Sequence, residues 1–301
     1  MQTTHLLSLA LLATLSACSG SSGDGGGNGG TSSLGGEANQ STSPAGAGGS
    51  DSTSGTGGNG NTTVAATGGT SQGTDGLLLF GAPYANVNMW YGPVDFSQSA
   101  YHNGCGQSDG SKYPAVIQNL YGNYLIGLDG DNIPKVESHC DNCAQLTANG
   151  KTIVARIITY GQENGVDAID LSPDARTVLG LSDSNWTGTW QFSSCPTGNT
   201  PIYYEFDARQ WSSPPNFWYM RIWARNQRLP ITLLETKVGT GAWTAASQQI
   251  DGAWQTPGGV DYSGGFQIRV TAVDKQQLVD SIPAPPGLNP ANPAAGLANF
   301  N

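Results

Sequence analysis

One acidic residue stands out as a candidate for acid–base chemistry. Asp170 lies in the run Ala168–Pro173 (AIDLSP), between the apolar residues Ile169 and Leu171. Partial burial between such neighbours raises the pKa of a carboxyl group, and a general acid needs a raised pKa. A purely structural interpretation also fits, because Asp170 and Ser172 are both residue types that cap a following helix.

Hydrolysis by paired carboxylates needs a second acidic residue besides Asp170. An inverting glycosidase places its two carboxyl groups roughly 6.5–9.5 Å apart, with water between them. The strand expected before Asp170 ends near Ile158 and Thr159, and neither is acidic. Glu163 and Asp167 are closer in sequence but fall in an expected turn. We therefore expect Asp170 to bind a ligand without cleaving it.

A second candidate surface is aromatic. Trp218 and Tyr219 are adjacent, and Trp223 follows within the same expected strand. Because side chains alternate along a strand, Tyr219 and Trp223 are predicted to face solvent, about 13 Å apart, with Trp218 facing inward. A bulge at the start of the strand would turn Trp218 outward as well. Trp254 is a candidate third ring, whereas Trp243 is predicted to lie in the core.

Four cysteines predict two disulfide bonds, because an even number in an exported chain is typical of a disulfide framework. They are Cys105, Cys140, Cys143 and Cys195, and all three pairings remain open. The Cys140–Cys143 spacing also fits a redox pair or half of a zinc site. We expect neither, since the sequence has no second CxxC and only His139 lies nearby. No metal or cofactor is expected.

The N-terminus is predicted to be a targeting signal rather than part of the fold. Leu6–Ala17 is apolar but too short to span a bilayer, and it ends in Leu-Ser-Ala-Cys, which resembles a bacterial lipobox. We expect a signal peptide over residues 1–17 and a lipid on Cys18, with an ordinary signal peptide as the alternative. The protein is then exported, as an outer-membrane or cell-surface lipoprotein or in secreted form. It would meet the membrane only through that anchor.

Composition separates a spacer from the rest of the chain. Residues 18–76 are rich in Gly and Ser and contain no aromatic residue, so we expect a disordered linker. A Gly/Ser-rich chain of this length has an r.m.s. reach of about 40–45 Å. The formal charge of −10 argues against nucleic-acid binding, which needs a basic face. We expect a monomer.

Residues 77–196 contain short strand candidates separated by turn residues, with a lead-in over 77–96 that packs on them. One helix is predicted over Ala175–Leu179, with Pro173 at its first position and Gly180 at its end.

Residues 197–284 alternate between apolar and polar side chains in several runs and carry no helix signal. This pattern is typical of a small antiparallel sandwich. Residues 285–301 are rich in Pro, Ala and Asn and are expected to form a loose tail.

Two stretches together resemble a bacterial expansin. The first is Ala168–Pro173, after the strand candidate at Gly150–Val154. The second is Phe217–Ile222, followed by the RNQRLP run Arg225–Pro230. Gly241-Ala242-Trp243 and Asp280-Ser281-Ile282-Pro283 also fit. The resemblance covers about 97–284. It implies an all-β protein with a six-stranded double-psi β-barrel and a short helix, followed by an immunoglobulin-like sandwich of the family-63 carbohydrate-binding type.

The resemblance also implies roles for individual residues. It places Asp170 in the barrel groove, with further groove candidates at Thr159, Tyr160, Tyr101 and His102. Trp218 and Tyr219 match the start of the aromatic platform of the family. Since many expansins carry a second Asp where this chain has Ile158 or Thr159, the sequence departs from the family there.

The implied function is that of a non-enzymatic protein that binds cellulose or another β-1,4-glucan and loosens plant-type cell walls. One alternative is an enzyme on the same barrel, either an endoglucanase or a lytic transglycosylase resembling rare lipoprotein A. Another is a purely carbohydrate-binding protein. Peptidoglycan and chitin are alternative polymers.

Overall fold

The computed structural model describes residues 76–92, 94–96, 104–106, 113–129, 136–161, 168–182, 186–289 and 291–301. The predicted signal peptide, Cys18 and the linker up to residue 75 lie outside these residues, as do Tyr101, His102, Glu163 and Asp167. Among the helices that are described, none is long and apolar enough to cross a membrane.

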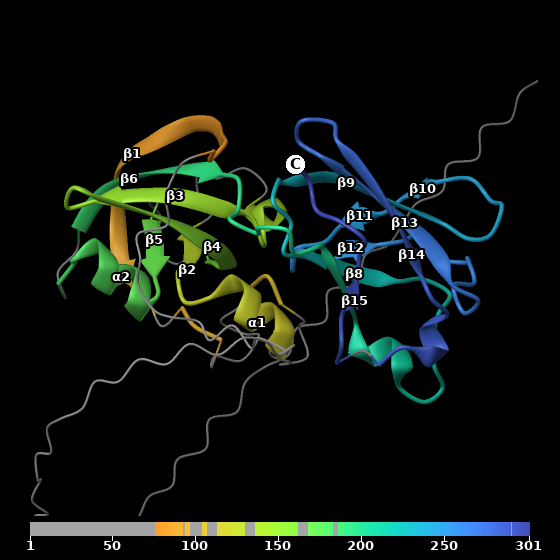
Figure 1. Ribbon diagram of the computed structural model, residues 1–301. Helices are drawn as coiled ribbons and strands as arrows, with labels where there is room; N and C mark the ends of the chain where they lie inside the picture. Colours follow the sequence, from red (N-terminus) through yellow and green to blue (C-terminus); the bar gives the residue numbers. More distant parts are fainter. Residues whose placement is uncertain are drawn as a thin grey trace, which may run out of the picture. The chain divides into compact units, whose positions relative to one another are not determined.

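Six strands close into a barrel in the order β1-β5-β2-β4-β3-β6 (Figure 1). They are β1 (Leu79–Tyr91), β2 (Leu125–Asp129), β3 (Cys143–Ala148), β4 (Lys151–Gly161), β5 (Ala168–Leu171) and β6 (Trp186–Ser193). The pairs β1–β5 and β2–β4 are parallel, and the other four are antiparallel. The predicted six-stranded barrel is confirmed.

The first strand corrects the prediction of a lead-in over residues 77–96. β1 pairs with both β5 and β6, and its Val87 and Met89 are buried in the barrel core. The alternation of Val87 and Met89 with Asn88 and Trp90 is a strand signal that the prediction overlooked.

Two helices lie beside the barrel strands. α2 (Pro173–Leu179) is the predicted one: the Ser172 hydroxyl accepts a hydrogen bond from the Ala175 N–H, and Gly180 ends the helix in a left-handed conformation. α1 (Ala115–Tyr121) was not predicted, because it has no side-chain N-cap and begins directly after Pro114. Its buried face joins a separate apolar cluster with Leu125 and Ile158 of the barrel.

The second half of the described chain forms two antiparallel sheets, as predicted for a sandwich. One has the strand order β10-β9-β13-β14 and the other β11-β12-β8-β7-β15. The strands are β7 (Tyr203–Phe206), β8 (Arg221–Arg225), β9 (Ile231–Lys237), β10 (Thr244–Ala245), β11 (Ser247–Gln248), β12 (Trp254–Gln255), β13 (Phe266–Ala272), β14 (Gln277–Ile282) and β15 (Ala294–Ala295). Three 3-10 turns are η1 (Val136–His139), η2 (Ala208–Trp211) and η3 (Pro285–Gly287). Alternate residues of the longer strands fill the core between the sheets.

The C-terminal segment is not the loose tail that its composition predicts. β15 pairs with β7 as the fifth strand of its sheet, and the side chain of Phe300 is buried in the sandwich core. The Leu297 N–H donates to the buried carboxylate of Asp280, with a distance of 2.7 Å between N and Oδ1. The Asn299 amide donates to two backbone carbonyls of the sandwich. The segment therefore completes the domain.

The two predicted disulfides pair Cys105 with Cys140 and Cys143 with Cys195. The two cysteines of the CxxC motif thus take different partners and do not form a redox pair. They hold the residues between them, Asp141 and Asn142, from both sides.

Candidate functional site

Strand register places Asp170 in a row of four residues that crosses four neighbouring barrel strands. Trp90 of β1 pairs with Asp170 of β5, Asp170 pairs with Gly127 of β2, and Gly127 pairs with Thr159 of β4. Their chain neighbours Met89, Ile169, Ile126 and Leu128 belong to the core cluster of the barrel. Because side chains alternate along a strand, this Asp170 row faces outward.

Two glycines make room for the side chains of the row. A Cβ atom on Gly92 would lie 2.7 Å from Cβ of Asp170, and one on Gly127 would lie 2.8 Å from Cγ2 of Thr159. Both distances are shorter than real Cβ contacts, so a larger residue at either position would displace its neighbour. The partly exposed side chain of Asp170 therefore has glycine backbone close to it on two sides.

A β-bulge in β4 decides which residue joins the row opposite Asp170. Ile126 pairs with Ile157 and Gly127 pairs with Thr159, which leaves Ile158 as the extra residue. Ile158 is buried beneath α1 with Tyr113 and Tyr121. The Thr159 hydroxyl accepts a hydrogen bond from the Gly104 N–H at 2.9 Å. The position is thus occupied by a neutral hydroxyl group.

Tyr160, predicted to line the groove, faces the other way. It pairs with Leu128 and packs, half-buried, against the barrel core. Its ring also lies 3.0 Å from the position of a Cβ on Gly104. Trp90 belongs to the Asp170 row although the sequence pattern predicts a lead-in for this segment. Tyr101 and His102 lie outside the described residues, so their groove roles stay predictions.

The aromatic residues predicted to form a platform on the sandwich are arranged differently from the prediction. The side chain of Trp218 is 59% exposed, and Tyr219 beside it is half-buried. β8 begins only at Arg221, so the alternation of a regular strand does not reach these two residues. The Trp218 N–H donates to the side chain of Asn216, and the carbonyl of Tyr219 accepts from the side chain of Gln210. These contacts turn Trp218 outward at an irregular strand start.

Two other predicted platform rings are buried, and their assignment is wrong. Trp223 has 0% exposure, and its indole N–H donates to the carbonyl of Asp251 at 2.9 Å. Trp254 is 7% exposed and packs in the sandwich core. Conversely, Trp243 is half-buried rather than part of that core. Its ring centre lies 4.5 Å from the guanidinium carbon of Arg269.

Arg221, two residues after Tyr219, belongs to a cluster of charged side chains. The carboxylate of Asp207 contacts the guanidinium groups of Arg209 and Arg221, and Arg221 also pairs with Asp251 at 2.5 Å. Burial alone would raise the pKa of Asp207, but hydrogen bonds and charge from Arg209, together with the charge of Arg221, lower it below the ordinary value. Asp207 is therefore held in its ionised form.

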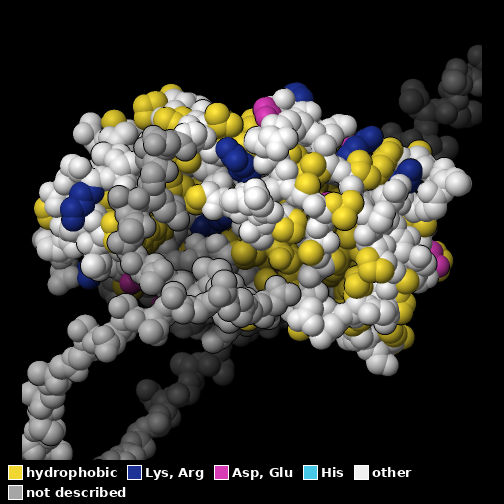
Figure 2. All heavy atoms as spheres, viewed as in Figure 1, with side chains coloured by type: hydrophobic (Ala, Val, Ile, Leu, Met, Phe, Trp, Pro, Cys, Tyr) yellow, Lys and Arg dark blue, Asp and Glu magenta, His cyan; other side chains and the backbone are white. Residues whose placement is uncertain are grey.

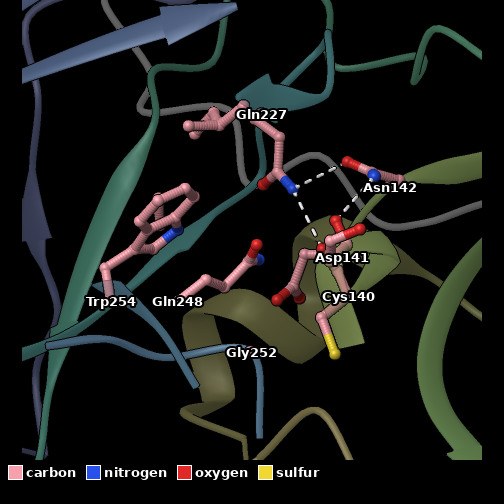
Figure 3. Close-up of a pocket in the computed structure, with 10 residues that line it drawn as sticks. Cys140, Asp141, Asn142, Gln227, Gln248, Gly252 and Trp254 are labelled. Carbon is pink, nitrogen blue, oxygen red and sulfur yellow. Dashed lines mark hydrogen bonds between the residues drawn. The ribbon is translucent and has the colours of Figure 1, made fainter. Parts of the chain in front are cut away.

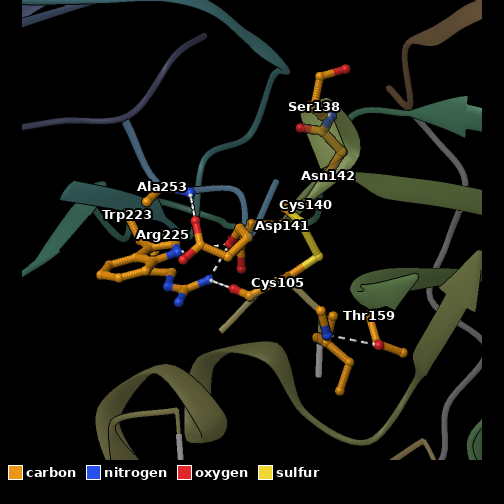
Figure 4. The surroundings of a disulfide bond; sticks show 12 residues. Cys105, Ser138, Cys140, Asp141, Asn142, Thr159, Trp223, Arg225 and Ala253 are labelled. Atoms are coloured by element: carbon orange, nitrogen blue, oxygen red, sulfur yellow. Dashed lines mark hydrogen bonds and ion pairs between the residues drawn. A yellow bond between two sulfur atoms is a disulfide. The ribbon is translucent and has the colours of Figure 1, made fainter. Parts of the chain in front are cut away.

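The sheet face that carries Trp223 packs against the barrel, through a buried ion cluster (Figure 4). Arg225 is fully buried and contacts Asp141 Oδ2 at 2.5 Å, Glu205 Oε2 at 2.8 Å and the carbonyl of Cys105 at 2.9 Å. The Tyr121 hydroxyl donates to the other oxygen of Asp141 at 2.5 Å. Burial lowers the pKa of Arg225, but the two carboxylates outweigh it and raise that pKa well above the ordinary value.

The segment Arg225–Arg228 therefore joins the barrel and the sandwich. Besides Arg225, the carbonyl of Gln227 accepts a hydrogen bond from Arg156 of β4, and the carbonyl of Arg228 accepts from the Cys195 N–H. Each disulfide includes a cysteine that makes one of these contacts: the carbonyl of Cys105 accepts from Arg225, and the N–H of Cys195 donates to Arg228. The Asp170 row and the Trp218 platform consequently belong to one connected structure.

Solved structures of known proteins resemble the fold of this chain. No protein-family model matches the sequence, and no curated protein does either. The fold is similar to the crystal structure of apo expansin from Clavibacter michiganensis, with a TM-score of 0.58 and 15% sequence identity over 73% of this chain and 98% of that chain.

A second similar structure is a variant of the same Clavibacter expansin in complex with cellohexaose. Its TM-score is 0.57, at 14% identity and with the same coverage of both chains. The chain therefore has a bacterial expansin-like fold.

Proposed function

We propose that this chain is a non-hydrolytic, expansin-like protein that binds cellulose or another β-1,4-glucan and loosens plant-type cell walls. The exposure of Trp218 carries this proposal. A tryptophan that is 59% exposed beside Tyr219 offers a flat apolar face to solvent, and sugar rings stack on such faces. The similar expansin that was crystallised with cellohexaose supports a glucan as the ligand.

The residues of the Asp170 row support binding without cleavage. Asp170 can accept hydrogen bonds from sugar hydroxyls, but its counterpart across Gly127 is Thr159. A threonine hydroxyl cannot act as the second carboxylate that glycoside hydrolysis requires. We therefore assign Asp170 to binding rather than to acid catalysis.

Stacking, rather than charge, is proposed to supply most of the affinity. Charged residues make up only 11% of the chain and are sparse on the face shown in Figure 2. Binding to a wall should therefore change little as salt is added, because salt screens only electrostatic attraction. A steep loss of binding between low and physiological salt would contradict this.

Export completes the proposal. A lipid on Cys18 and the Gly/Ser-rich segment after it would tether the two domains at a distance from a membrane, where they could reach a polymer. Labelling with a radioactive fatty acid tests this: the wild type should incorporate label, and Cys18→Ala should not.

A binding assay on microcrystalline cellulose tests whether the protein binds a glucan without cleaving it. Bound protein and released reducing sugar are measured in the same tubes for the wild type, Trp218→Ala and Tyr219→Ala. The control is Leu297→Ala, which also removes an exposed apolar side chain, at 88% exposure. We expect the two aromatic variants to lose binding, the control to keep it, and no tube to contain released sugar.

Released sugar would show a hydrolase instead. Equal binding by all variants would remove Trp218 from the site. If the wild type does not bind cellulose, the ligand is a different polymer, and peptidoglycan and chitin are the next to assay.

A further inference from the structure

The backbone segment that carries Trp218 and Tyr219 lies just before strand β8, beyond the end of the neighbouring strand β7. The last residue pair between β7 and β8 is Phe206–Ile222, after which the chain leaves β7 and forms η2. β7 therefore ends before it reaches the carbonyl of Tyr219 and the N–H of Arg221. Because backbone groups need hydrogen-bond partners when they are shielded from water, another group must take the place of the strand here.

The side-chain amide of Gln210 in η2 takes that place. Gln210 is 2% exposed, its Nε2 donates to the carbonyl of Tyr219, and its Oε1 accepts from the N–H of Arg221 at 3.1 Å. Its own carbonyl accepts from the N–H of Asn216 at 2.9 Å, which closes the loop that leads to Trp218. Turning the amide around would face donor with donor and acceptor with acceptor, so only one orientation satisfies both contacts.

The other side of the same segment is held by the loop that follows β12. The N–H of Met220 donates to the Thr256 hydroxyl at 2.8 Å, and the carbonyl of Met220 accepts from the N–H of Thr256 at 2.9 Å. The carbonyl of Trp218 accepts from the N–H of Gly259 at 2.9 Å. With these contacts in place, removing the amide of Gln210 would release the segment on the η2 side alone.

We propose that Gln210 is a positioning residue for glucan binding: its amide fixes the backbone that carries Tyr219 and Trp218 before the sugar arrives. The proposal rests on the glucan-binding function proposed above and adds to it a buried residue. An aromatic side chain that is already ordered in the free protein loses less conformational freedom on binding than a mobile one. Gln210 thus acts on affinity through the free protein.

Replacing Gln210 with leucine removes both amide contacts at similar side-chain volume. Calorimetric titration of the whole protein with cellohexaose should then show binding weakened by roughly 5- to 100-fold, because two aromatic side chains must be ordered during binding. In the absence of sugar, hydrogen–deuterium exchange of the backbone amides in residues 216–221 should be faster in Gln210→Leu than in the wild type. Both measurements are made at a temperature at which circular dichroism shows every variant to be folded.

Gln227→Leu is the matched control. Gln227 is also buried, at 3% exposure, and its Nε2 also makes two contacts, to the carbonyl of Cys140 at 3.4 Å and to Oδ1 of Asn142 at 3.3 Å (Figure 3). These contacts join the sandwich to the barrel and do not involve residues 216–221. The control should lower the free energy of unfolding, but cellohexaose binding and amide exchange in residues 216–221 should stay as in the wild type.

Gln210→Glu separates positioning from a general loss of stability. A protonated carboxyl group can donate to the carbonyl of Tyr219 and accept from the N–H of Arg221, as the amide does, whereas an ionised one can only accept. Cellohexaose binding by this variant should therefore be weak at neutral pH and recover as the pH falls. Asp207 and Asp251 pair with Arg221 and titrate in the wild type as well, so the wild-type profile is the reference.

The two proposals fail in different ways. Unchanged binding by Gln210→Leu, an equal loss in Gln227→Leu, or a pH profile of Gln210→Glu that runs parallel to the wild-type profile would each overturn the positioning role and leave glucan binding standing. If the wild type does not bind cellohexaose, the glucan proposal is overturned. Amide exchange then decides on Gln210 alone: faster exchange supports its positioning of the segment, and unchanged exchange overturns it. Gln210→Glu keeps the test valid if Gln210→Leu does not fold.

Discussion

Replacing Arg225 with methionine would leave two buried carboxylates without the guanidinium group that contacts both of them. Asp141 is 2% exposed and Glu205 is 1% exposed, so water cannot take the place of the lost cation. Removing one partner of a buried ion pair costs about 3–5 kcal/mol. For a folded unit of roughly 150–250 residues, that loss lowers Tm by about 6–20 °C. Urea unfolding followed by tryptophan fluorescence measures the free energy, and calorimetry measures Tm.

Arg269→Met is the matched control for this substitution. Arg269 also pairs with a carboxylate, that of Glu235 at 2.7 Å, but the two side chains are 25% and 14% exposed. A solvent-exposed pair of this kind contributes little to stability, because water screens the two charges. Adding Asp141→Asn to Arg225→Met should recover part of the loss, because it removes one of the stranded charges. A free energy of unfolding for Arg225→Met within about 1 kcal/mol of the wild type would refute the reasoning.

Three further predictions concern the tail, the groove and pH. Phe300→Ala should lower the free energy of unfolding by about 3–5 kcal/mol, because the side chain of Phe300 is buried. Leu297→Ala, at an exposed site, should change it by less than about 0.5 kcal/mol. Equal effects of the two substitutions in urea unfolding would mean that the C-terminal segment is loose. Gly127→Val should displace Thr159 and weaken oligosaccharide binding, and unchanged titration would remove the Asp170 row from the site. Because its arginine partners lower the pKa of Asp207, its stabilising contribution is present above the unfolded pKa of about 3.9 and is lost as pH falls through the folded value. The stability difference between wild type and Asp207→Asn should therefore shrink in acid, and a difference that grows would contradict the assignment.

Local signals in the sequence predicted much of the fold. The helix α2 follows from Ser172, Pro173 and Gly180, which act through contacts with their own neighbours. The alternation in Phe266–Ala272 predicts a strand with one buried face, and β13 has those bounds. Such patterns succeed because the residues that determine them are close together in the chain.

The errors arose where distant parts of the chain decide the outcome. Alternation correctly separates Trp223 from the sandwich core, but the opposite face of the sheet is not open to water: Trp223 is fully buried there, and Arg225 on the same face contacts Cys105 beside the barrel. The bulge that selects Thr159 over Ile158 is a property of strand pairing and has no local signal. Similarly, the order of the C-terminal segment comes from its contacts with β7 and with Asp280, and its composition does not show them.

Wall loosening without hydrolysis is tested by the extension of a heat-inactivated plant cell wall under constant load. Creep and released sugar are recorded together for the wild type and Asp170→Asn. We expect faster creep with wild-type protein, no released sugar, and a loss of creep in the variant. Creep that is accompanied by released sugar, or no creep with a wild-type protein that binds the wall, would contradict it.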